Sequence, residues 1–253
     1  MPTLHQTNIQ YNTNYQLSNK GGKLSSDGGL ILVKEFMKQI NFEKILEKFL
    51  SFKETRKYHA HSQHELFQQL LLQQIAGYNT DAASNILRKD PLFSDIFNLS
   101  TSQPTFSRFI NEKDHPDNKK VHDLMTRLGE LLSTENNQRQ AIIDIDSTHS
   151  DIFGKQENSD FNGHYKTNGY HPLLAFEQTT GALLGAQLRS GNQYTSKNAE
   201  TFLEPILDSF IDKEIGCLVR GDSGFAKSEI YQLCDQEFVK FIIRLKASQK
   251  LKK

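Results

Sequence analysis

The sequence predicts an all-α region followed by a domain that combines β-strands with helices. Between Ser25 and Leu132, apolar residues recur at spacings of three and four, which is the period of an amphipathic helix. At Gln140 this pattern gives way to β-branched runs with a period of two. The elements expected after that point run in the order three strands, helix, strand, helix, strand. We therefore expect an N-terminal arm at residues 1–24, a helical region at 25–139 and a strand-containing domain at 140–253.

The composition is that of a folded, soluble chain. Its 253 residues are 36% hydrophobic and 24% charged, and the mean hydropathy is -0.58. No apolar run approaches the ~20 residues of a membrane-spanning helix, and the first residues do not resemble a secretion signal. Cys217 and Cys234 are too few for a disulfide framework, so we expect a reducing, cytoplasmic setting. The net charge of zero excludes a surface covered in positive charge, as in a histone. A surface that binds nucleic acid would therefore be a local basic patch.

Capping signals delimit the first helices of the helical region. Asp27 is expected to cap the first of them. Ser62 and Glu65 have the spacing of a capping box, in which each side chain binds the backbone N–H of the other residue. Gly77 is a suitable stop for the helix that this box opens.

Proline and acidic residues mark the later helices. Thr80 is expected to begin a short helix that ends before Pro91, since the residue preceding a proline avoids the helical conformation. Pro104 lies near the first position of the next helix, Ser102–Asn111. Proline is tolerated there because the first N–H groups of a helix have no acceptor within the helix. Asp117 is expected to open the last helix of the region.

The helix Ser102–Asn111 is a candidate for DNA recognition. Its polar side carries Thr105, Ser107 and Arg108, and helix-turn-helix proteins present side chains of this kind to the major groove. The same pattern fits an ordinary helical bundle with a solvated face, and the connection to the preceding helix is longer than a tight turn. The sequence leaves both interpretations open.

The second domain begins with a strand that carries two acidic residues. In Ala141–Thr148, the period of two places Asp144 and Asp146 on one face, about 7 Å apart along the strand. Pro205 lies inside the helical stripe Phe202–Phe210, so that helix is expected to be kinked or to start late. The other expected elements are strands at Tyr170–Phe176, Ala182–Leu188, Ile215–Arg220 and Phe238–Leu245, and a helix capped by Ser228.

Two of these strands end in an aspartate that a serine follows. Asp146 ends the first strand, and Asp222 follows the strand Ile215–Arg220. Open α/β sheets bind their ligands at the carboxyl ends of the strands. Carboxylate oxygens suit Mg²⁺ or Mn²⁺, which catalyse phosphoryl transfer in many enzymes. The alternative is that both aspartates are ordinary turn residues.

Several motifs in the chain resemble those of a known family. They are D-I-D-S-T at Asp144–Thr148, Y-H-P-L-L-A-F at Tyr170–Phe176, L-R-S-G-N at Leu188–Asn192, R-G-D-S-G-F at Arg220–Phe225 and S-Q-P-T-F-S-R-F at Ser102–Phe109. In combination they resemble the DDE transposases of bacterial insertion sequences, and most closely insertion-sequence family thirteen-eighty. The resemblance spans nearly the whole chain and implies a ribonuclease H-like mixed β-sheet domain after the helical region.

The resemblance also implies the catalytic residues. The first catalytic aspartate of the family falls on Asp146, with Asp144 as its rival, and the second falls on Asp222. The third acid of the family is a glutamate on a later helix, and no acidic residue after Asp222 lies in the matching context. We therefore expect a C-terminally truncated, incomplete catalytic domain with little strand-transfer activity on its own.

The implied activity is metal-dependent DNA cleavage and strand transfer. Asp146 and Asp222 would hold Mg²⁺ or Mn²⁺, two ions in the complete enzyme. The helical region would bind terminal inverted repeats through Thr105, Ser107 and Arg108. The resemblance further implies a homodimer on DNA, in the cytoplasm and associated with the nucleoid. Two alternatives remain: a non-catalytic DNA-binding fragment that inhibits a full-length transposase, and a two-metal nuclease whose third ligand lies within this chain.

His59, His61 and His64 form a second possible metal site. The pattern H-x-H-x-x-H could bind Zn²⁺, but no cysteine lies nearby and the spacing matches no recognised zinc motif. Exposed histidines in a loop and at a helix start are the simpler interpretation.

Overall fold

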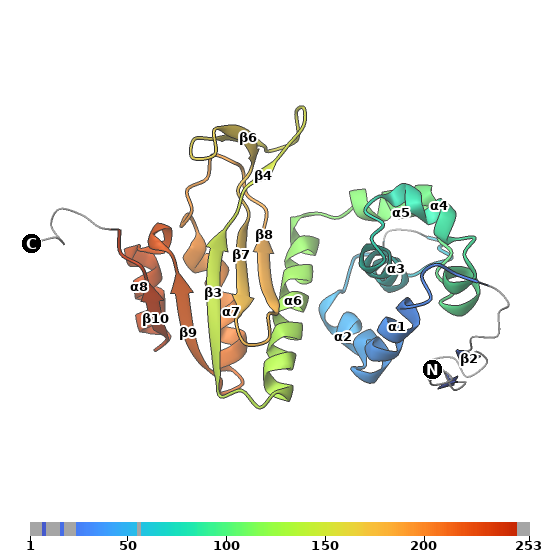
Figure 1. Cartoon of the computed structure of the whole chain (residues 1–253), viewed down its shortest axis with the longest axis horizontal. Coiled ribbons are helices and arrows are strands. Elements are labelled where there is room, and N and C mark those ends of the chain that lie inside the picture. Colours follow the sequence, from blue (N-terminus) through green and yellow to red (C-terminus); the bar gives the residue numbers. More distant parts are fainter. Residues whose placement is uncertain (1–6, 9–15, 18–23, 55–56, 247–253) are drawn as a thin grey trace, which may run out of the picture. The chain divides into compact units, whose positions relative to one another are not determined.

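The structure of the chain is a computed structural model that describes residues 7–8, 16–17, 24–54 and 57–246 (Figure 1). From the expected N-terminal arm it contains Leu24 and two short strands, β1 (Thr7–Asn8) and β2 (Gln16–Leu17), which pair antiparallel. The remainder of the arm lies outside the described residues. None of the described helices is both long and apolar enough to cross a membrane.

The chain divides into two compact units, Met1–Val121 and His122–Lys253. The boundary falls inside helix α6 (His115–Glu135), whereas the sequence pattern changes after residue 139. The described part of the first unit is helical beyond its two short strands, as predicted. Its elements are α1 (Leu30–Gln39), α2 (Phe42–Phe49), α3 (Gln63–Ile75), η1 (Asp81–Ala83), α4 (Ser84–Leu87), η2 (Leu92–Ile96), α5 (Gln103–Asn111) and the start of α6.

Local signals define both ends of α3 in this unit. The capping box of α3 is confirmed, because Ser62 accepts a hydrogen bond from the N–H of Glu65 and Glu65 accepts one from the N–H of Ser62. Gly77 follows α3 with a φ of +87°, a conformation that favours glycine. The prediction for Asp27 was wrong, since its carboxylate accepts a hydrogen bond from the Tyr78 hydroxyl and α1 begins later. The start of α6 is at His115, before the predicted Asp117.

The second unit contains a five-stranded mixed sheet in the order β10-β9-β3-β7-β8 (Figure 1). Strand β3 pairs antiparallel with β7 and parallel with β9, β7 pairs antiparallel with β8, and β9 pairs parallel with β10. This is the ribonuclease H-like arrangement that the motifs predict. The strands are β3 (Gln140–Ser147), β7 (Leu173–Glu177), β8 (Leu183–Gln187), β9 (Gly216–Gly221) and β10 (Lys240–Ile243).

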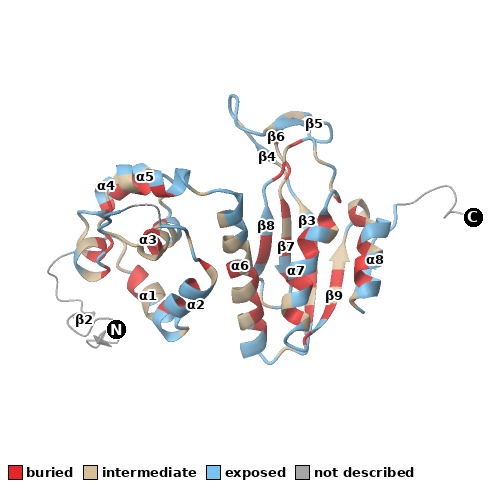
Figure 2. Cartoon of the chain, turned by 180° about the vertical axis from the view of Figure 1, so that it is seen from behind, coloured by how far each residue is buried: buried red, intermediate tan, exposed pale blue. Residues whose placement is uncertain are grey.

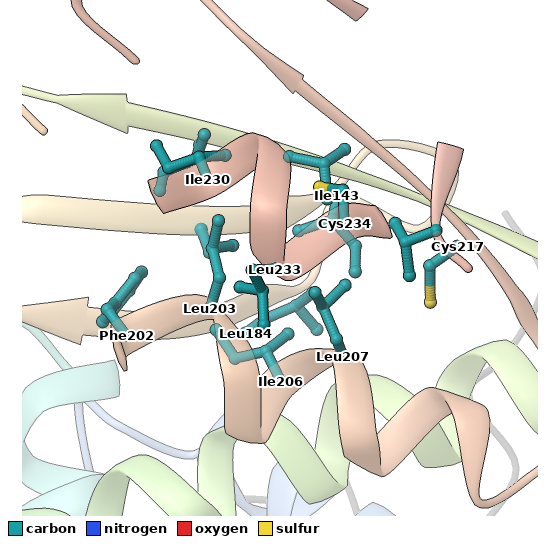
Figure 3. Packing of buried hydrophobic residues seen from close by; sticks show 14 of the residues in the cluster. Ile143, Leu184, Phe202, Leu203, Ile206, Leu207, Cys217, Ile230, Leu233 and Cys234 are labelled. Carbon is teal, nitrogen blue, oxygen red and sulfur yellow. The ribbon is translucent and has the colours of Figure 1, made fainter. Parts of the chain in front are cut away.

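Helices cover one face of this sheet. Helices α7 (Ala199–Ile211) and α8 (Ser228–Gln236) bury their apolar sides against it, and Figure 3 shows Ile143 of β3 among the side chains of both. The part of α6 in this unit packs along β8, where the hydroxyl of Thr126 donates to the Leu184 carbonyl at 2.7 Å. Along β3 and β7 the buried residues alternate with less buried ones (Figure 2). The less buried set on β3 includes Asp144 and Asp146, which therefore lie on the opposite face.

Two predictions for this unit were wrong in detail. The strand expected at Tyr170–Phe176 is divided into β6 (Thr167–Tyr170) and β7, because Pro172 between them has no N–H to donate. Strand β6 instead forms a small separate sheet with β4 (Ser150–Asp151) and β5 (Asp160–Asn162), which the sequence did not predict.

The start of α8 also differs from the prediction. Its N-cap residue is Lys227, and no side chain caps the helix there. Ser228 is the first helical residue, and its hydroxyl donates to the neighbouring Glu229 carboxylate at 3.0 Å. The helix α7 begins at Ala199, directly after Asn198, and contains Pro205 in its interior.

Candidate active site

The parallel pairing of β3 and β9 brings two aspartates to the same edge of the sheet. The register pairs Ile145 with Gly221, and the next residues along the two strands are Asp146 and Asp222. Side chains alternate between faces along a strand, and both aspartates are exposed where the residues before them are more buried. Asp222 is the first residue after β9, so the register continued by one residue would make Asp146 and Asp222 neighbours on the open face, at the carboxyl ends of adjacent strands.

Local hydrogen bonds orient both carboxylates. Asp146 Oδ1 accepts a hydrogen bond from the N–H of Ser147 at 2.7 Å. Asp222 Oδ1 accepts one from the N–H of Gly224 at 2.8 Å, which caps the short helix η3 (Ser223–Phe225). Among the described residues, neither Oδ2 atom has a hydrogen-bond donor, and neither carboxylate has a basic partner. Each aspartate thus presents one oxygen that is available to a ligand.

The third aspartate on this face has a different environment. Asp144 lies opposite Arg220 in the register, and the guanidinium donates to both of its oxygens at 2.6 Å. The hydrogen bonds to Asp144 raise the pKa of Arg220. The bidentate pair neutralises Asp144 and occupies the oxygens that a metal would need. The role of Arg220 was not predicted from the sequence, although Arg220 precedes Asp222 by the same two residues that separate Asp144 from Asp146.

The donor set of the two remaining aspartates fits a divalent cation. Carboxylate oxygens are the ligands that Mg²⁺ and Mn²⁺ prefer, and two like charges on neighbouring strand ends are stabilised by a cation between them. Within the described ranges, no group of three or more His, Cys, Asp and Glu side chains is arranged to hold a metal. Asp146 and Asp222 would therefore supply part of the coordination shell of such an ion, and other ligands would complete it.

The predicted DNA-contacting residues lie together on α5, in the first unit. Arg108 is exposed, and its Nε donates to the Pro104 carbonyl at 3.2 Å. Ser107 accepts a hydrogen bond from Asn111 at 3.2 Å, and Thr105 lies within hydrogen-bond distance of Ser102, at 3.1 Å. The connection from α4 to α5 contains the π-helical turn η2, so the two helices are not joined by the tight turn of a helix-turn-helix motif.

Thr105 and Arg108 also line a pocket of about 260 Å³. His59 and His61, two of the three histidines considered for zinc, lie on the same pocket. The third, His64, uses its Nε2 in a 2.9 Å hydrogen bond with the Leu50 carbonyl. The three rings are therefore divided between a pocket wall and a helix start.

The family model named Transposase DDE domain group 1 matches residues 7–253. No curated protein matches the sequence. The solved structures to which the chain is similar include the catalytic domain of Mos1 mariner transposase, at 7% identity and a TM-score of 0.32, covering 55% of this chain and 66% of that one. They also include the Drosophila P element transposase strand transfer complex, at 10% identity and a TM-score of 0.38, covering 81% of this chain and 47% of that one. This chain thus spans less than two thirds of either. The family model alone makes the assignment, and the chain belongs to the DDE transposases.

Proposed function

We propose that this chain is a transposase of insertion-sequence family thirteen-eighty, whose reaction is metal-dependent DNA cleavage and strand transfer, and that it contributes Asp146 and Asp222 to that reaction. The observation that supports this most strongly is the register of β3 and β9, which pairs Ile145 with Gly221, the residues directly before Asp146 and Asp222. The family membership supplies the reaction class, and the motifs around both aspartates supply the narrower family. Asp146 and Asp222 are the catalytic residues of this proposal.

In this proposal, Asp146 and Asp222 hold Mg²⁺ or Mn²⁺. The bound metal supplies Lewis-acid activation and stabilises charge on the phosphate that is attacked. The N–H groups of Ser147 and Gly224 fix the two carboxylates, so that little freedom is lost when a ligand binds. The ion pair of Asp144 and Arg220 lies one pleat behind them, about 7 Å along the strand.

The helical unit would recognise DNA in this scheme. Thr105, Ser107 and Arg108 lie on α5, and we propose that they contact the terminal inverted repeats of the element, on which two copies of the chain would assemble. Arg108 is the exposed cation of this set and is suited to a phosphate or a guanine edge. Binding by this unit requires none of the acids of the second unit.

A second candidate function is a DNA-binding inhibitor of a full-length transposase. One observation favours it: among the described residues, no group of three or more His, Cys, Asp and Glu side chains is arranged to hold a metal. The same observation weighs against a self-contained two-metal nuclease. The predicted truncation, with a third acid missing from this chain, stays a prediction.

The test is cleavage of labelled inverted-repeat DNA in the presence of Mn²⁺. The proposal expects a nick at the end of the element with the parent chain and none with Asp146→Asn or Asp222→Asn. A matched control is Asp208→Asn, an exposed aspartate on α7, which should cleave as the parent does. Binding without cleavage by the parent would favour the inhibitor, and the absence of binding would contradict both functions.

A further inference from the structure

We infer that the loop of residues 190–198, between β8 and α7, docks a nucleotide of the DNA strand beside Asp222. Tyr194 would stack on the base, and Lys227 and Lys197 would meet the phosphates. This inference rests on the proposed function, because it names a contact that places DNA at the same carboxylates. We call residues 190–198 the Tyr194 loop.

The Tyr194 loop begins at the edge of the sheet where the two aspartates lie. Strands β3 and β9 run parallel, and β8 runs in the same direction as β3, because each pairs antiparallel with β7. The carboxyl ends of β3, β8 and β9 therefore meet at one edge (Figure 1). The segment that leaves β8 starts at this edge.

A buried arginine holds the loop in place. Arg189 is only 8% exposed, and its Nε donates to the His171 carbonyl at 3.0 Å. Its Nη1 lies 3.4, 3.0 and 3.2 Å from the carbonyl oxygens of Tyr194, Thr195 and Lys197. Burying a guanidinium among neutral acceptors costs free energy. The hydrogen bonds that Arg189 makes there hold three residues of a surface loop. The backbone beneath the Tyr194 ring is therefore held in one conformation.

The loop also contacts the turn that carries Asp222. A Cβ atom placed on Gly224 would lie 2.8 Å from Thr195 Cγ2 and 3.0 Å from Asp222 Oδ1. Gly224 is thus packed between the loop and the carboxylate, and its N–H is the group that orients Asp222. Because this contact is direct, a ligand bound on the loop lies next to the candidate metal site.

The outer side of the loop has the chemistry of a nucleotide-binding surface. Tyr194 is 60% exposed, and Lys227 Nζ lies 5.1 Å from the centroid of its ring. Lys197 is also exposed, and residues 190–198 contain no acidic side chain. An aromatic ring that stacks on a base, with ammonium groups for the backbone phosphates, is how proteins bind exposed DNA strands without reading their sequence.

The first experiment locates the contact by photo-cross-linking. A short single-stranded oligonucleotide of bromodeoxyuridine is bound to the full chain in EDTA, irradiated, and the linked peptide is identified by mass spectrometry. We expect a cross-link at Tyr194 that Tyr194→Phe retains and Tyr194→Ala loses. Phe238→Ala is the control, because Phe238 is 95% exposed in the same unit and should not affect the pattern.

The second experiment measures affinity for fluorescent oligodeoxythymidine by anisotropy. Tyr194→Ala should weaken binding by roughly 5- to 150-fold, the range for loss of one base–aromatic stack. Tyr194→Phe and Phe238→Ala should bind as the parent does. Lys227→Gln should lower the slope of log affinity against log salt by about one phosphate contact.

The outcomes separate this inference from the proposed function. Cross-links confined to other segments, or equal affinities of Tyr194→Ala and the parent, overturn the inference even if the parent cleaves DNA. A Tyr194 cross-link on a chain that does not cleave supports the inference and contradicts only the catalytic proposal.

Discussion

The pairs Asp144–Arg220 and Asp146–Asp222 occupy successive positions on the same two strands and the same face. In the first pair, an acid faces a base, and two hydrogen bonds of 2.6 Å join them. In the second pair, two acids are neighbours, and each is held by a single backbone N–H. In the first pair, the two opposite charges balance each other and need no further ligand. The second has excess negative charge, which a cation would balance in our proposal.

Glu177 shows a further way in which this sheet satisfies a carboxylate. Glu177 on β7 is fully buried, and its oxygens accept hydrogen bonds from the N–H of Ile142 and from the N–H and hydroxyl of Thr180. Burial acts to raise the pKa of Glu177, but these hydrogen bonds outweigh it and the pKa is lowered. The sheet thus holds carboxylates satisfied by an arginine, by hydrogen-bond donors and, in our proposal, by a metal.

The largest expected effect is on catalysis. Asp146→Asn or Asp222→Asn should reduce Mn²⁺-dependent cleavage by roughly a thousandfold or more, since each removes a ligand of the metal. Neither should lower the thermal midpoint in EDTA, because the substitution relieves repulsion between two neighbouring acids. A large loss of stability in either variant would mean that the aspartate is needed for folding rather than for catalysis.

Glu177→Gln should act on stability. The amide cannot accept the same set of hydrogen bonds, and the free energy of unfolding should fall by about 2 kcal/mol in urea denaturation. The lowered pKa of the folded state stabilises the parent above the unfolded pKa, and this contribution is lost as the pH falls through the folded pKa. The parent should therefore lose stability on acidification below about pH 4, and the variant should lose less. If the parent and the variant lost the same stability on acidification, this role of Glu177 would be contradicted.

The two arginines allow a matched comparison. Arg189→Lys should lower the free energy of unfolding by about 2 kcal/mol, because an ammonium cannot reach the same four carbonyls. Limited proteolysis should then cut within residues 190–198. Arg220→Lys, at a half-buried ion pair, should change stability much less, and its effect should shrink in high salt. Equal losses of unfolding free energy in the two variants would contradict the claim that burial makes the Arg189 guanidinium more important for stability than that of Arg220.

The smallest effect is expected for Asp144→Asn. Cleavage should fall by less than about tenfold, because Asp144 acts on the neighbouring acids only through its charge and that of Arg220. A loss as large as that of Asp146→Asn would reverse the assignment of the first catalytic aspartate. The comparison uses the same DNA, metal concentration and pH for both variants.

Local patterns were sufficient to predict the elements that carry the candidate site. The β-branched run at Gln140–Ser147 and the strand before Asp222 are recognisable because alternation and strand-end residues are properties of short segments. The capping box at Ser62 is equally local and is confirmed. Asp27 failed as a cap because a tertiary partner, the Tyr78 hydroxyl 51 residues away, binds its carboxylate.

The features that the sequence did not predict depend on register or on backbone acceptors. Asp144 and Arg220 are 76 residues apart, and only the β3–β9 pairing makes them partners. Arg189 lies in the L-R-S-G-N motif, but its hydrogen bonds could not be predicted, because its acceptors are carbonyl groups that every residue possesses. Strand β4 has only two residues, too few for any alternation to be visible.

The most direct test of the central claim is a titration of Mn²⁺ into the full chain, followed by the electron paramagnetic resonance signal of the free ion. Asp146→Asn and Asp222→Asn should each weaken binding by about tenfold or more, and the double variant should bind little more weakly than either, because both remove the same site. Asp144→Asn should bind as the parent does. Unchanged Mn²⁺ affinity in both single variants would contradict the account.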